Sequence, residues 1–210
     1  MGAVYGPAVT VVLMSHSSRQ ATSADLDAVV STLTSAFLRD PVWGPVFPDE
    51  ARRAAQMAEL WRVYADAALR YPWTFVTPGA EAVAVWIPPG GVELTEAEER
   101  RRGEVMERVA GAGVARAVEE TEASFGAAHP EEPFYHLTIL GTHADHRGKG
   151  LGMALLSDTL ARLDDIGANA YLESTNPAND RRYESVGFVP RGELVTPGGQ
   201  TVTTMWRPAG

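Results

Sequence analysis

A glycine-rich segment, Arg147-Gly148-Lys149-Gly150-Leu151-Gly152, carries the strongest chemical signal in the sequence. It lies between an apolar run typical of a strand and an apolar run typical of a helix. Its three glycines allow the backbone to curl closely around a ligand. A helix that starts here leaves main-chain N–H groups free, and its dipole favours negative charge. We therefore predict an anion site for a diphosphate group at this turn.

The spacing of these glycines distinguishes the segment from two other phosphate-binding loops. A Walker A loop needs Gly-x-x-x-x-Gly-Lys-Ser/Thr, and a dinucleotide-binding loop needs Gly-x-Gly-x-x-Gly. Here the glycines recur at every second residue, so neither pattern is present. Lys149 is the only lysine among the 210 residues. The alternative for the segment is a plain turn that joins a strand to a helix.

Composition and charge restrict the classes of protein to which the chain can belong. With 210 residues, 45% of them hydrophobic and 21% charged, the chain fits one domain with a substantial core. It has no cysteine, which excludes disulfides, thiolate metal ligands and a cysteine nucleophile. The formal net charge of -9 argues against a nucleic-acid partner and suits a cationic acceptor.

The sequence contains one short apolar run near its start, over residues 8–14. No basic segment precedes it, so we interpret it as a strand or a loose arm, rather than a signal peptide or a membrane span. We therefore expect a cytoplasmic protein without a membrane partner. The arginine-rich, lysine-poor and alanine-rich composition is typical of a GC-rich bacterial genome.

The first half of the chain alternates between helical and strand patterns. Thr22 and Asp25 form a capping-box pattern that predicts a helix as far as Phe37, and Pro41 prevents its continuation. The other elements expected in this half are a loop with Trp43, Pro45, Phe47 and Pro48, a helix over 50–69, strands over 73–76 and 82–87, and a charged helical segment over 93–125 with breaks near Gly103 and 111–113. That charged segment either covers the sheet or acts as a mobile lid.

The second half predicts elements that position the glycine-rich segment. A strand over 134–142 comes before it, with Tyr135, Leu137 and Ile139 on one face. His136, Thr138 and Leu140 are expected on the other face. After the segment we expect a helix to Ile166, a strand over 170–175, a short helix from Asn176-Pro177 to Gly187, and a final strand over 202–206. This order indicates a mixed sheet with helices on its faces.

Two spaced motifs, Arg147-x-x-Gly150-x-Gly152 and Asn179-x-x-x-Tyr183-x-x-x-Gly187-Phe188, resemble those of the GNAT superfamily of acyl-CoA-dependent N-acetyltransferases. Ala36-Phe37-x-x-Asp40-Pro41, residues 82–86 and Leu172-Glu173-Ser174-Thr175 are similar to the branch that includes puromycin N-acetyltransferase. The resemblance implies an α/β (mixed α+β) GNAT fold, in which a twisted mixed sheet is splayed at a cofactor wedge and helices cover both faces. Residues 1–16 are then expected to form an extension, and residues 17–210 a single GNAT domain.

The resemblance also implies how the chain binds acetyl-CoA. Main-chain N–H groups of residues 147–153 would hold the pyrophosphate, and residues 140–142 would pair with the pantetheine amides. The expected cofactor-binding residues are Leu140, Gly141, Thr142, Arg147, Gly148, Lys149, Gly150, Leu151, Gly152, Met153 and Asn179. Tyr183 lies one helical turn after Asn179 and would protonate the departing thiolate. The alternative for Tyr183 is a tyrosine packed beneath the sheet.

Direct attack by the amine requires that a base or a water chain first remove a proton from it. Glu173 is one candidate base, because burial in an apolar strand raises the pKa of a carboxyl group. Its alternative is a structural hydrogen-bond acceptor. His136 is the rival base, because its intrinsic pKa suits proton transfer at neutral pH, and its alternative is a core histidine. A backbone N–H near Leu140 or Gly141 would polarise the thioester carbonyl.

The acceptor pocket and the function follow from the same interpretation. Trp43 and Phe47 are expected to line an aromatic acceptor pocket together with His136. No metal site is expected, because the histidines lack partners at convincing spacing. We expect a monomer or homodimer that acetylates a primary amine of a small molecule, by analogy an antibiotic-like compound or aminonucleoside, in an antibiotic-resistance role. The alternatives are acetylation of a protein or peptide amine, and a non-catalytic acyl-CoA-binding module.

Overall fold

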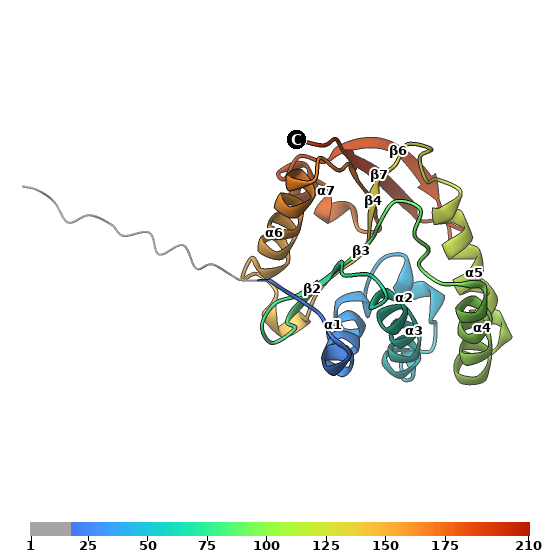
Figure 1. Cartoon of the computed structure of the whole chain (residues 1–210). Coiled ribbons are helices and arrows are strands. Elements are labelled where there is room, and N and C mark those ends of the chain that lie inside the picture. Colours follow the sequence, from blue (N-terminus) through green and yellow to red (C-terminus); the bar gives the residue numbers. More distant parts are fainter. Residues whose placement is uncertain (1–17) are drawn as a thin grey trace, which may run out of the picture.

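A seven-stranded mixed sheet forms the centre of the computed structural model, which describes residues 18–210 (Figure 1). The extension expected over residues 1–16, and with it the apolar run 8–14, lies outside the described residues. The strands are β1 (Arg19–Gln20), β2 (Thr74–Val76), β3 (Ala82–Ile87), β4 (Tyr135–Thr142), β5 (Ala170–Ser174), β6 (Val189–Val195) and β7 (Thr201–Arg207). Their order is β1-β2-β3-β4-β5-β7-β6, and β4 and β5 are parallel whereas the other neighbours are antiparallel.

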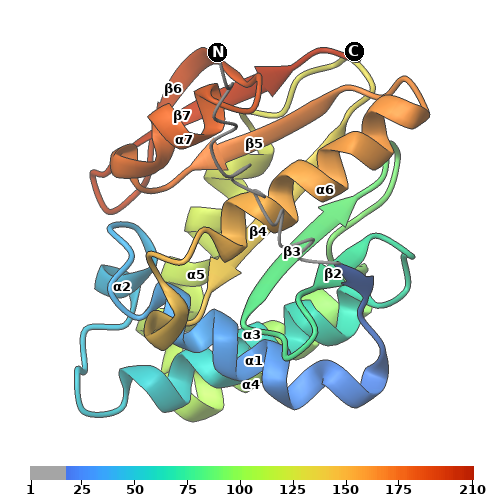
Figure 2. The same ribbon diagram turned by 90° about the vertical axis from the view of Figure 1, so that its left-hand side faces the viewer.

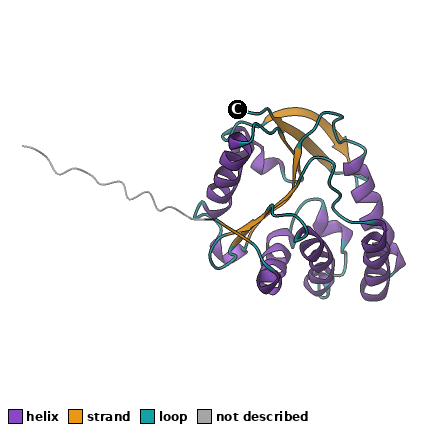
Figure 3. Cartoon of the chain, viewed as in Figure 1, coloured by secondary structure: helices purple, strands orange, loops and turns teal. Residues whose placement is uncertain are grey.

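Helices cover both faces of this sheet, as the sequence predicts (Figures 2 and 3). They are α1 (Leu26–Phe37), α2 (Trp43–Val46), α3 (Arg53–Ala68), α4 (Glu96–Ala110), α5 (Ala112–Gly126), α6 (Leu151–Asp165) and α7 (Asp180–Glu184), with 3-10 turns at Ser23–Asp25, Ala144–His146 and Pro177–Asn179. One buried core lies between the sheet and α1, α3, α4 and α5. A second core lies on the opposite face under α6. The predicted α/β architecture is therefore confirmed.

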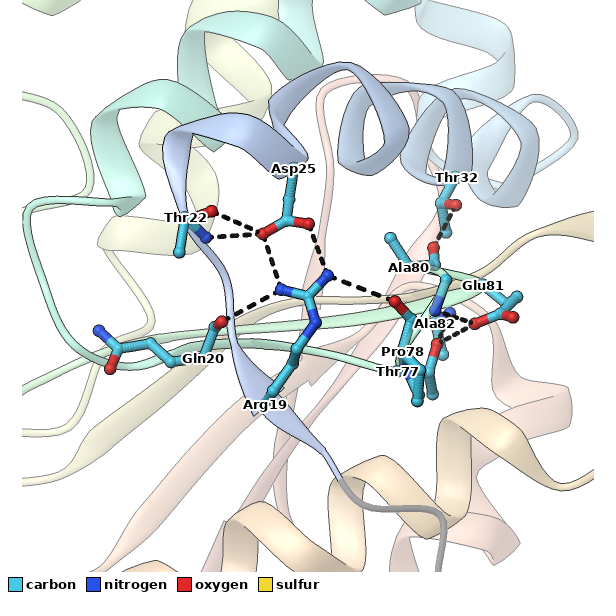
Figure 4. Close-up of polar contacts among 11 residues, drawn as sticks. Arg19, Gln20, Thr22, Asp25, Thr32, Thr77, Pro78, Ala80, Glu81 and Ala82 are labelled. Carbon is cyan, nitrogen blue, oxygen red and sulfur yellow. Dashed lines mark hydrogen bonds and ion pairs between the residues drawn. The ribbon is translucent and has the colours of Figure 1, made fainter.

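The start of the domain is held by a polar network around Asp25 (Figure 4). Asp25 accepts hydrogen bonds from the main-chain N–H and the hydroxyl of Thr22, which forms the predicted capping box. Arg19 donates to both carboxylate oxygens of Asp25 and to the carbonyl of Pro78. The hydroxyl of Thr32 donates 2.6 Å to the carbonyl of Ala80. These contacts fix α1 to the turn between β2 and β3.

The structure departs from the sequence prediction at three elements. The break expected near Gly103 is absent, since Gly103 lies inside α4, whereas the break expected near 111–113 occurs at Gly111, whose φ is +90°. The segment expected as a loop after Pro41 contains the short helix α2. Strand β6 was not predicted, because Pro190 and Gly192 weaken its pattern. A proline is tolerated there because β6 is an edge strand of the sheet.

A β-bulge at Thr138 corrects the expected faces of β4. Ile139 pairs with Val85, and Leu137 pairs with the next residue, Trp86, so Thr138 is the extra residue. Leu137 therefore packs in the core under α6, whereas Ile139 packs in the core on the opposite face. The simple alternation expected from the sequence fails here, because a bulge adds one residue without a partner.

Strands β4 and β5 separate soon after they begin. They pair only at Tyr135 with Ala170 and at His136 with Tyr171 within the described residues. The rest of β4 diverges from β5, which produces the expected wedge in the sheet. Among residues 18–210, no helix combines the length and the apolar composition that a membrane crossing needs.

Candidate active site

A cavity of about 1470 Å³ lies at the wedge between β4 and β5. Its lining includes the second half of β4, the glycine-rich segment, α7, α5 and the loop that follows β3. We call the part beside the glycine-rich segment the glycine-loop end. We call the part lined by Glu93, Glu122 and Glu173 the acidic end. The glycine-rich segment and the predicted site residues Glu173, Asn179 and Tyr183 thus line one cavity.

At the glycine-loop end, the backbone adopts conformations that favour glycine. Gly148 has a φ of +77°, and Gly150, at the start of α6, has a φ of +76°. A Cβ built at Gly152 would lie 2.6 Å from the hydroxyl oxygen of Thr142. The first turn of α6 is therefore pressed against β4, and its free N–H groups border the cavity. This cradle fits the pyrophosphate of acetyl-CoA.

Basic side chains surround this end of the cavity. Arg39, Arg147, Arg182 and His146 line it, and Arg147 donates 2.7 Å to the carbonyl of Ala36. Lys149, which the sequence analysis placed in the site, does not line the cavity and instead donates to the carbonyl of Asp145. The two glycines beside Lys149, Gly148 and Gly150, both have positive φ. The other expected cofactor residues all line the cavity.

Strand β4 presents free main-chain groups to the wedge. Residues 140–142 line the cavity beyond the last β4–β5 pair, so the edge of β4 that faces β5 has no strand partner there within the described residues. A Cβ at Gly141 would lie 3.0 Å from Leu33 and 3.1 Å from Ala36, so α1 closely supports the strand. An extended amide chain fits this edge as an added strand would, which matches the pantetheine arm.

The structure brings Tyr183 and Asn179 to the same cavity. Asn179 ends the 3-10 turn before α7, and its side-chain oxygen accepts a hydrogen bond of 3.0 Å from Arg182. The ring of Tyr183 packs edge-on against Phe188. Burial, followed by the charges of Asp40 and Asp180, raises the pKa of Tyr183 to about 12. The phenol therefore stays protonated at neutral pH and has a proton to donate.

Glu173 and His136 form a buried ion pair at the acidic end. Nε2 of His136 lies 2.6 Å from Oε2 of Glu173, and Nε2 of His129 lies 3.3 Å from Oε1 of Glu173. Burial alone would raise the pKa of Glu173, as expected from the sequence. The charge of His136, its hydrogen bond and the nearby ring of His129 outweigh burial and lower the pKa of Glu173 to about 2. The expectation of a raised pKa for Glu173 is therefore corrected.

The partner of Glu173 is charged for the same reason. Burial opposes a charge on the ring of His136, but the charge and hydrogen bond of Glu173 dominate and raise its pKa to about 9. On its other side, Nδ1 of His136 lies 3.6 Å from Oε1 of Glu93. At neutral pH the pair is an imidazolium and a carboxylate, and neither is a strong base.

His129, His136 and Glu173 are of residue types that can ligate a metal ion. Ligand atoms of His129, His136 and Glu173 all lie within 4.8 Å of one another. Two ligand atoms on one tetrahedral Zn²⁺ lie about 3.3 Å apart, because each bond is about 2.0–2.2 Å long. The 2.6 Å distance between His136 and Glu173 is instead that of a charge-assisted hydrogen bond. We therefore describe the group as an ion pair and assign no metal to it.

Aromatic side chains line the cavity, but not all of those expected. Trp43 lines it together with Trp61, Tyr64 and Phe125. Phe47 does not, because its side chain is fully buried in the core beside α3. The expected role of Phe47 in the acceptor pocket is therefore dropped. Trp43 stays a candidate, and its ring packs edge-on against Trp61.

Several cavity residues were missed by the sequence analysis. They are Tyr64, Glu93, Arg102, Glu122 and His129. Arg102 donates 2.8 Å to the hydroxyl of Tyr64, which in turn interacts with Glu122. One signal was available for Glu122, which lies on α5 at helical spacing from the buried Val118 and next to the buried Thr121. A carboxylate on the inward face of a helix indicates a site or a buried pair.

The sequence and the fold are similar to those of known acetyltransferases. Residues 60–188 match the acetyltransferase (GNAT) family. Over 77 residues the chain is 36% identical to the L-amino acid N-acyltransferase MnaT of Escherichia coli (strain K12). This alignment covers 34% of this chain and 45% of the length of MnaT. The described fold superposes on a structure titled histone acetyltransferase HPA2 and related acetyltransferase from Corynebacterium glutamicum, with a TM-score of 0.65, 26% identity, and coverage of 92% and 96% of the two chains.

A more distant structure shares the fold. Arylalkylamine N-acetyltransferase 2 from Aedes aegypti superposes with a TM-score of 0.57 and 14% identity, over 92% of this chain and 99% of that one. At this identity the likeness concerns the fold alone.

Proposed function

The chain belongs to the acetyltransferase (GNAT) family, and from this membership we propose that it acetylates a primary amine of a small molecule with acetyl-CoA. An N-acetyltransferase function of the GNAT kind follows from the family itself. The observation that carries the finer proposal is the single cavity, which joins a phosphate cradle to a pocket with aromatic walls and buried carboxylates. Such a pocket supports a small acceptor over a peptide, which would need an open groove.

Acetyl-CoA supplies an acetyl group activated as a thioester. In the reaction the amine nitrogen gains the acetyl group and loses one proton, and the sulfur of CoA gains one proton. The chain's own residues have to move both protons and to hold the reacting groups together. In this proposal a main-chain N–H at Leu140 or Gly141, both of which line the cavity, polarises the thioester carbonyl. The neutral phenol of Tyr183, which lines the same cavity, protonates the sulfur.

The amine proton can leave to Glu173, to His136 or to a water chain, and the ionisation of the site favours the water chain. Glu173, with a pKa of about 2, is too weak a base, and His136 already carries its proton at neutral pH. The cavity is large enough to hold water as well as an acceptor. In this proposal Glu173 and His136 are positioning residues that hold the wall of the pocket.

The identity of the acceptor is a proposal by analogy. The resemblance to the puromycin N-acetyltransferase branch suggests an antibiotic-like compound or an aminonucleoside, modified in the cytoplasm of a bacterium. Acetylation of a protein or peptide amine is the alternative within the same chemistry. A module that binds acyl-CoA without turnover is the alternative from another class, and the presence of Tyr183 in the wedge argues against it.

The test is release of free thiol from acetyl-CoA, followed with a DTNB-type reagent, against a panel of amines. The panel contains aminonucleosides, aminoglycosides, polyamines, amino acids and peptides. Rapid release with a class of small amines supports the proposal and names the substrate class. Rapid release with peptides alone would replace it with the peptide alternative. Tight CoA binding by calorimetry without release from any amine would replace it with the binding module.

A further inference from the structure

Charge is divided between the two ends of the cavity. The glycine-loop end is lined by arginines, which suit an anionic ligand. Its carboxylate, Asp40, is already satisfied, because it accepts hydrogen bonds from the N–H groups of Val42 and Trp43 and from the hydroxyl of Thr175. The acidic end contains Glu93, Glu122 and Glu173. The cavity is therefore built to receive opposite charges at its two ends.

Two cations, His136 and Arg102, lie among the three carboxylates of the acidic end. His136 is paired with Glu173 at 2.6 Å. Arg102 donates to the neutral hydroxyl of Tyr64 at 2.8 Å, so its charge acts on Glu122 and Glu93. Glu93 accepts a hydrogen bond from the hydroxyl of Thr138 and lies 3.6 Å from Nδ1 of His136, a cation that it shares with Glu173. Burial and the charge of Glu93 raise the pKa of Glu122 to about 8. Glu93, Glu122 and Glu173 thus share the charges of His136 and Arg102, so one carboxylate at this end has no countercharge of its own from these two cations.

An unpartnered oxygen at the same end provides an independent observation. Oε1 of Glu173 is buried, and its nearest donor, Nε2 of His129 at 3.3 Å, does not form a hydrogen bond with it within the described residues. The side chain of Glu173 is only 6% exposed and lines the cavity. A buried acceptor without a donor costs free energy, so a ligand donor is favoured there.

From these contacts we propose that the acceptor carries a second protonated nitrogen, and that Glu93 and Glu122 form the subsite that holds it. The inference rests on the proposed function. The nitrogen that attacks the thioester has to be uncharged, so it cannot also neutralise these carboxylates. A separate ammonium group at the acidic end supplies the missing countercharge and donors for the buried oxygens. The substrate class is a diamine or a polycationic amine.

The test compares each α,ω-diamine of three to eight carbons with the monoamine of the same carbon number. Kinetics on the full chain at saturating acetyl-CoA and calorimetry of the same amines are measured for the wild type and for Glu122→Gln and Glu93→Gln. Glu120→Gln is the matched control, because Glu120 lies on α5, is exposed and does not line the cavity. Glutamine keeps the shape of glutamate while it removes the charge.

We expect kcat/KM of the best diamine to exceed that of its monoamine about tenfold or more, the effect of one charge-assisted hydrogen bond. Glu122→Gln and Glu93→Gln should remove most of this difference by raising KM for the diamine alone. Glu120→Gln should leave both substrates unchanged. Equal kcat/KM for diamines and monoamines in the wild type would overturn the subsite. So would an equal loss of kcat for both amines in Glu122→Gln, which would indicate a base or a structural role.

The two proposals fail in distinguishable ways. Fast acetylation of monoamines without any preference for diamines retains the proposed function and overturns the subsite. Absence of acetyl transfer to every amine overturns the proposed function. In that case, calorimetric binding of a diamine that Glu122→Gln abolishes still supports the subsite.

Discussion

Tyr183 is the side chain on which the chemistry of the proposed reaction most directly depends. It lines the cavity on α7, and burial raises its pKa to about 12. We expect Tyr183→Phe to lower kcat by about 100-fold or more, the usual effect of losing a general acid. The affinity for CoA should change little, because the ring and its packing on Phe188 are retained. Thiol-release kinetics and calorimetry measure the two quantities separately.

A matched change at Tyr135 serves as the control for this prediction. Tyr135 starts β4, is partly buried and contacts Trp73, outside the cavity lining. Tyr135→Phe should leave kcat and CoA affinity unchanged. If Tyr183→Phe kept full turnover at every pH, the phenol would have no role in the reaction.

The ion pair of His136 and Glu173 makes a prediction about stability and pH. The pKa of His136 is raised to about 9, so its contribution is full below the unfolded value of 6.5 and is lost as the pH rises through 9. The pKa of Glu173 is lowered to about 2, so its contribution is full above 4.5 and is lost as the pH falls through 2. The free energy of unfolding should therefore fall between pH 6.5 and 9, by at least about 1 kcal/mol.

Denaturant unfolding of the wild type and of a variant with both His136→Gln and Glu173→Gln tests this. The double substitution removes both charges, so no buried charge is left without a partner. It should reduce the fall between pH 6.5 and 9. The free energy of unfolding of the variant will still fall somewhat over this range. The cause is Glu122, whose pKa is raised to about 8, so that a rising pH favours its ionisation in the unfolded state. An unchanged slope would show that the pair does not determine this pH dependence.

For individual residues, the sequence predicted which side chains lie in the site better than it predicted their ionisation. The family resemblance predicted that Asn179, Tyr183 and the glycines share a site, and helix geometry predicted only that Asn179 and Tyr183 lie on one face. It did not predict the pairing of Glu173 with His136, because they lie 37 residues apart and meet only through the β4–β5 contact. The sign of a pKa shift depends on such partners as much as on burial.

Among the elements, β4 makes the largest contribution to the site. Its bulge at Thr138 places Ile139 on the face opposite Leu137, and its divergence from β5 opens the wedge. Bulges occur next to active sites because they redirect side chains and end regular pairing. Here the bulge turns Thr138 toward Glu93, to whose carboxylate its hydroxyl donates a hydrogen bond.

The close approach of α6 to β4 at Gly152 makes a prediction about cofactor binding. Ala at position 152 would place its Cβ 2.6 Å from the hydroxyl oxygen of Thr142. The first turn of α6 has to move, and we expect Gly152→Ala to cost about 1–3 kcal/mol of stability or CoA affinity. Thr142→Ala removes the oxygen, and the next contact of the new Cβ, with the Cβ of residue 142, is 3.9 Å.

The double variant with Gly152→Ala and Thr142→Ala should therefore recover most of the lost affinity. Calorimetry with CoA and thermal unfolding measure the four proteins of this cycle. Alanine also has a higher helix propensity than glycine, so the double variant is expected to be no less stable than Thr142→Ala alone. A double variant as impaired as Gly152→Ala would show that the contact with Thr142 is not the cause.

The elements with strong periodicity were predicted well, and the exceptions have physical reasons. Helices α1, α3 and α6 and strands β2 to β5 lie within a few residues of their predicted bounds, since each carries an apolar stripe or an alternating pattern. Strand β6 has mostly exposed residues and a proline, so its only requirement is main-chain pairing with β7. Gly103 is partly buried and stays helical on α4, where the buried Arg102 and Met106 hold the helix against its neighbours.

For the molecule as a whole, the distribution of charge relates the acidic composition to the site. A chain with a formal net charge of -9 repels the anionic phosphates of CoA at long range. Arginines at the glycine-loop end reverse this locally, whereas the acidic end keeps the sign of the whole molecule. A cationic acceptor is thus attracted first by the overall field and then by the cavity. The sequence predicted this preference for a cation from net charge alone, but the placement of the carboxylates required the fold.

The distribution of charge predicts how acetylation depends on salt. Electrostatic attraction is proportional to the charge of the ligand and weakens as the Debye length shortens from about 10 Å at 0.1 M to about 3 Å at 1 M. At saturating acetyl-CoA, log(kcat/KM) for a diamine should fall with ionic strength about twice as steeply as for the monoamine of equal length.

Glu119 and Glu131 are exposed at the acidic end of the cavity lining. Glu119→Gln with Glu131→Gln should make the diamine slope shallower without a change in kcat, because these side chains attract the substrate but do not contact the reacting atoms. Equal slopes for the two amines would mean that the field of the molecule does not select the doubly charged acceptor.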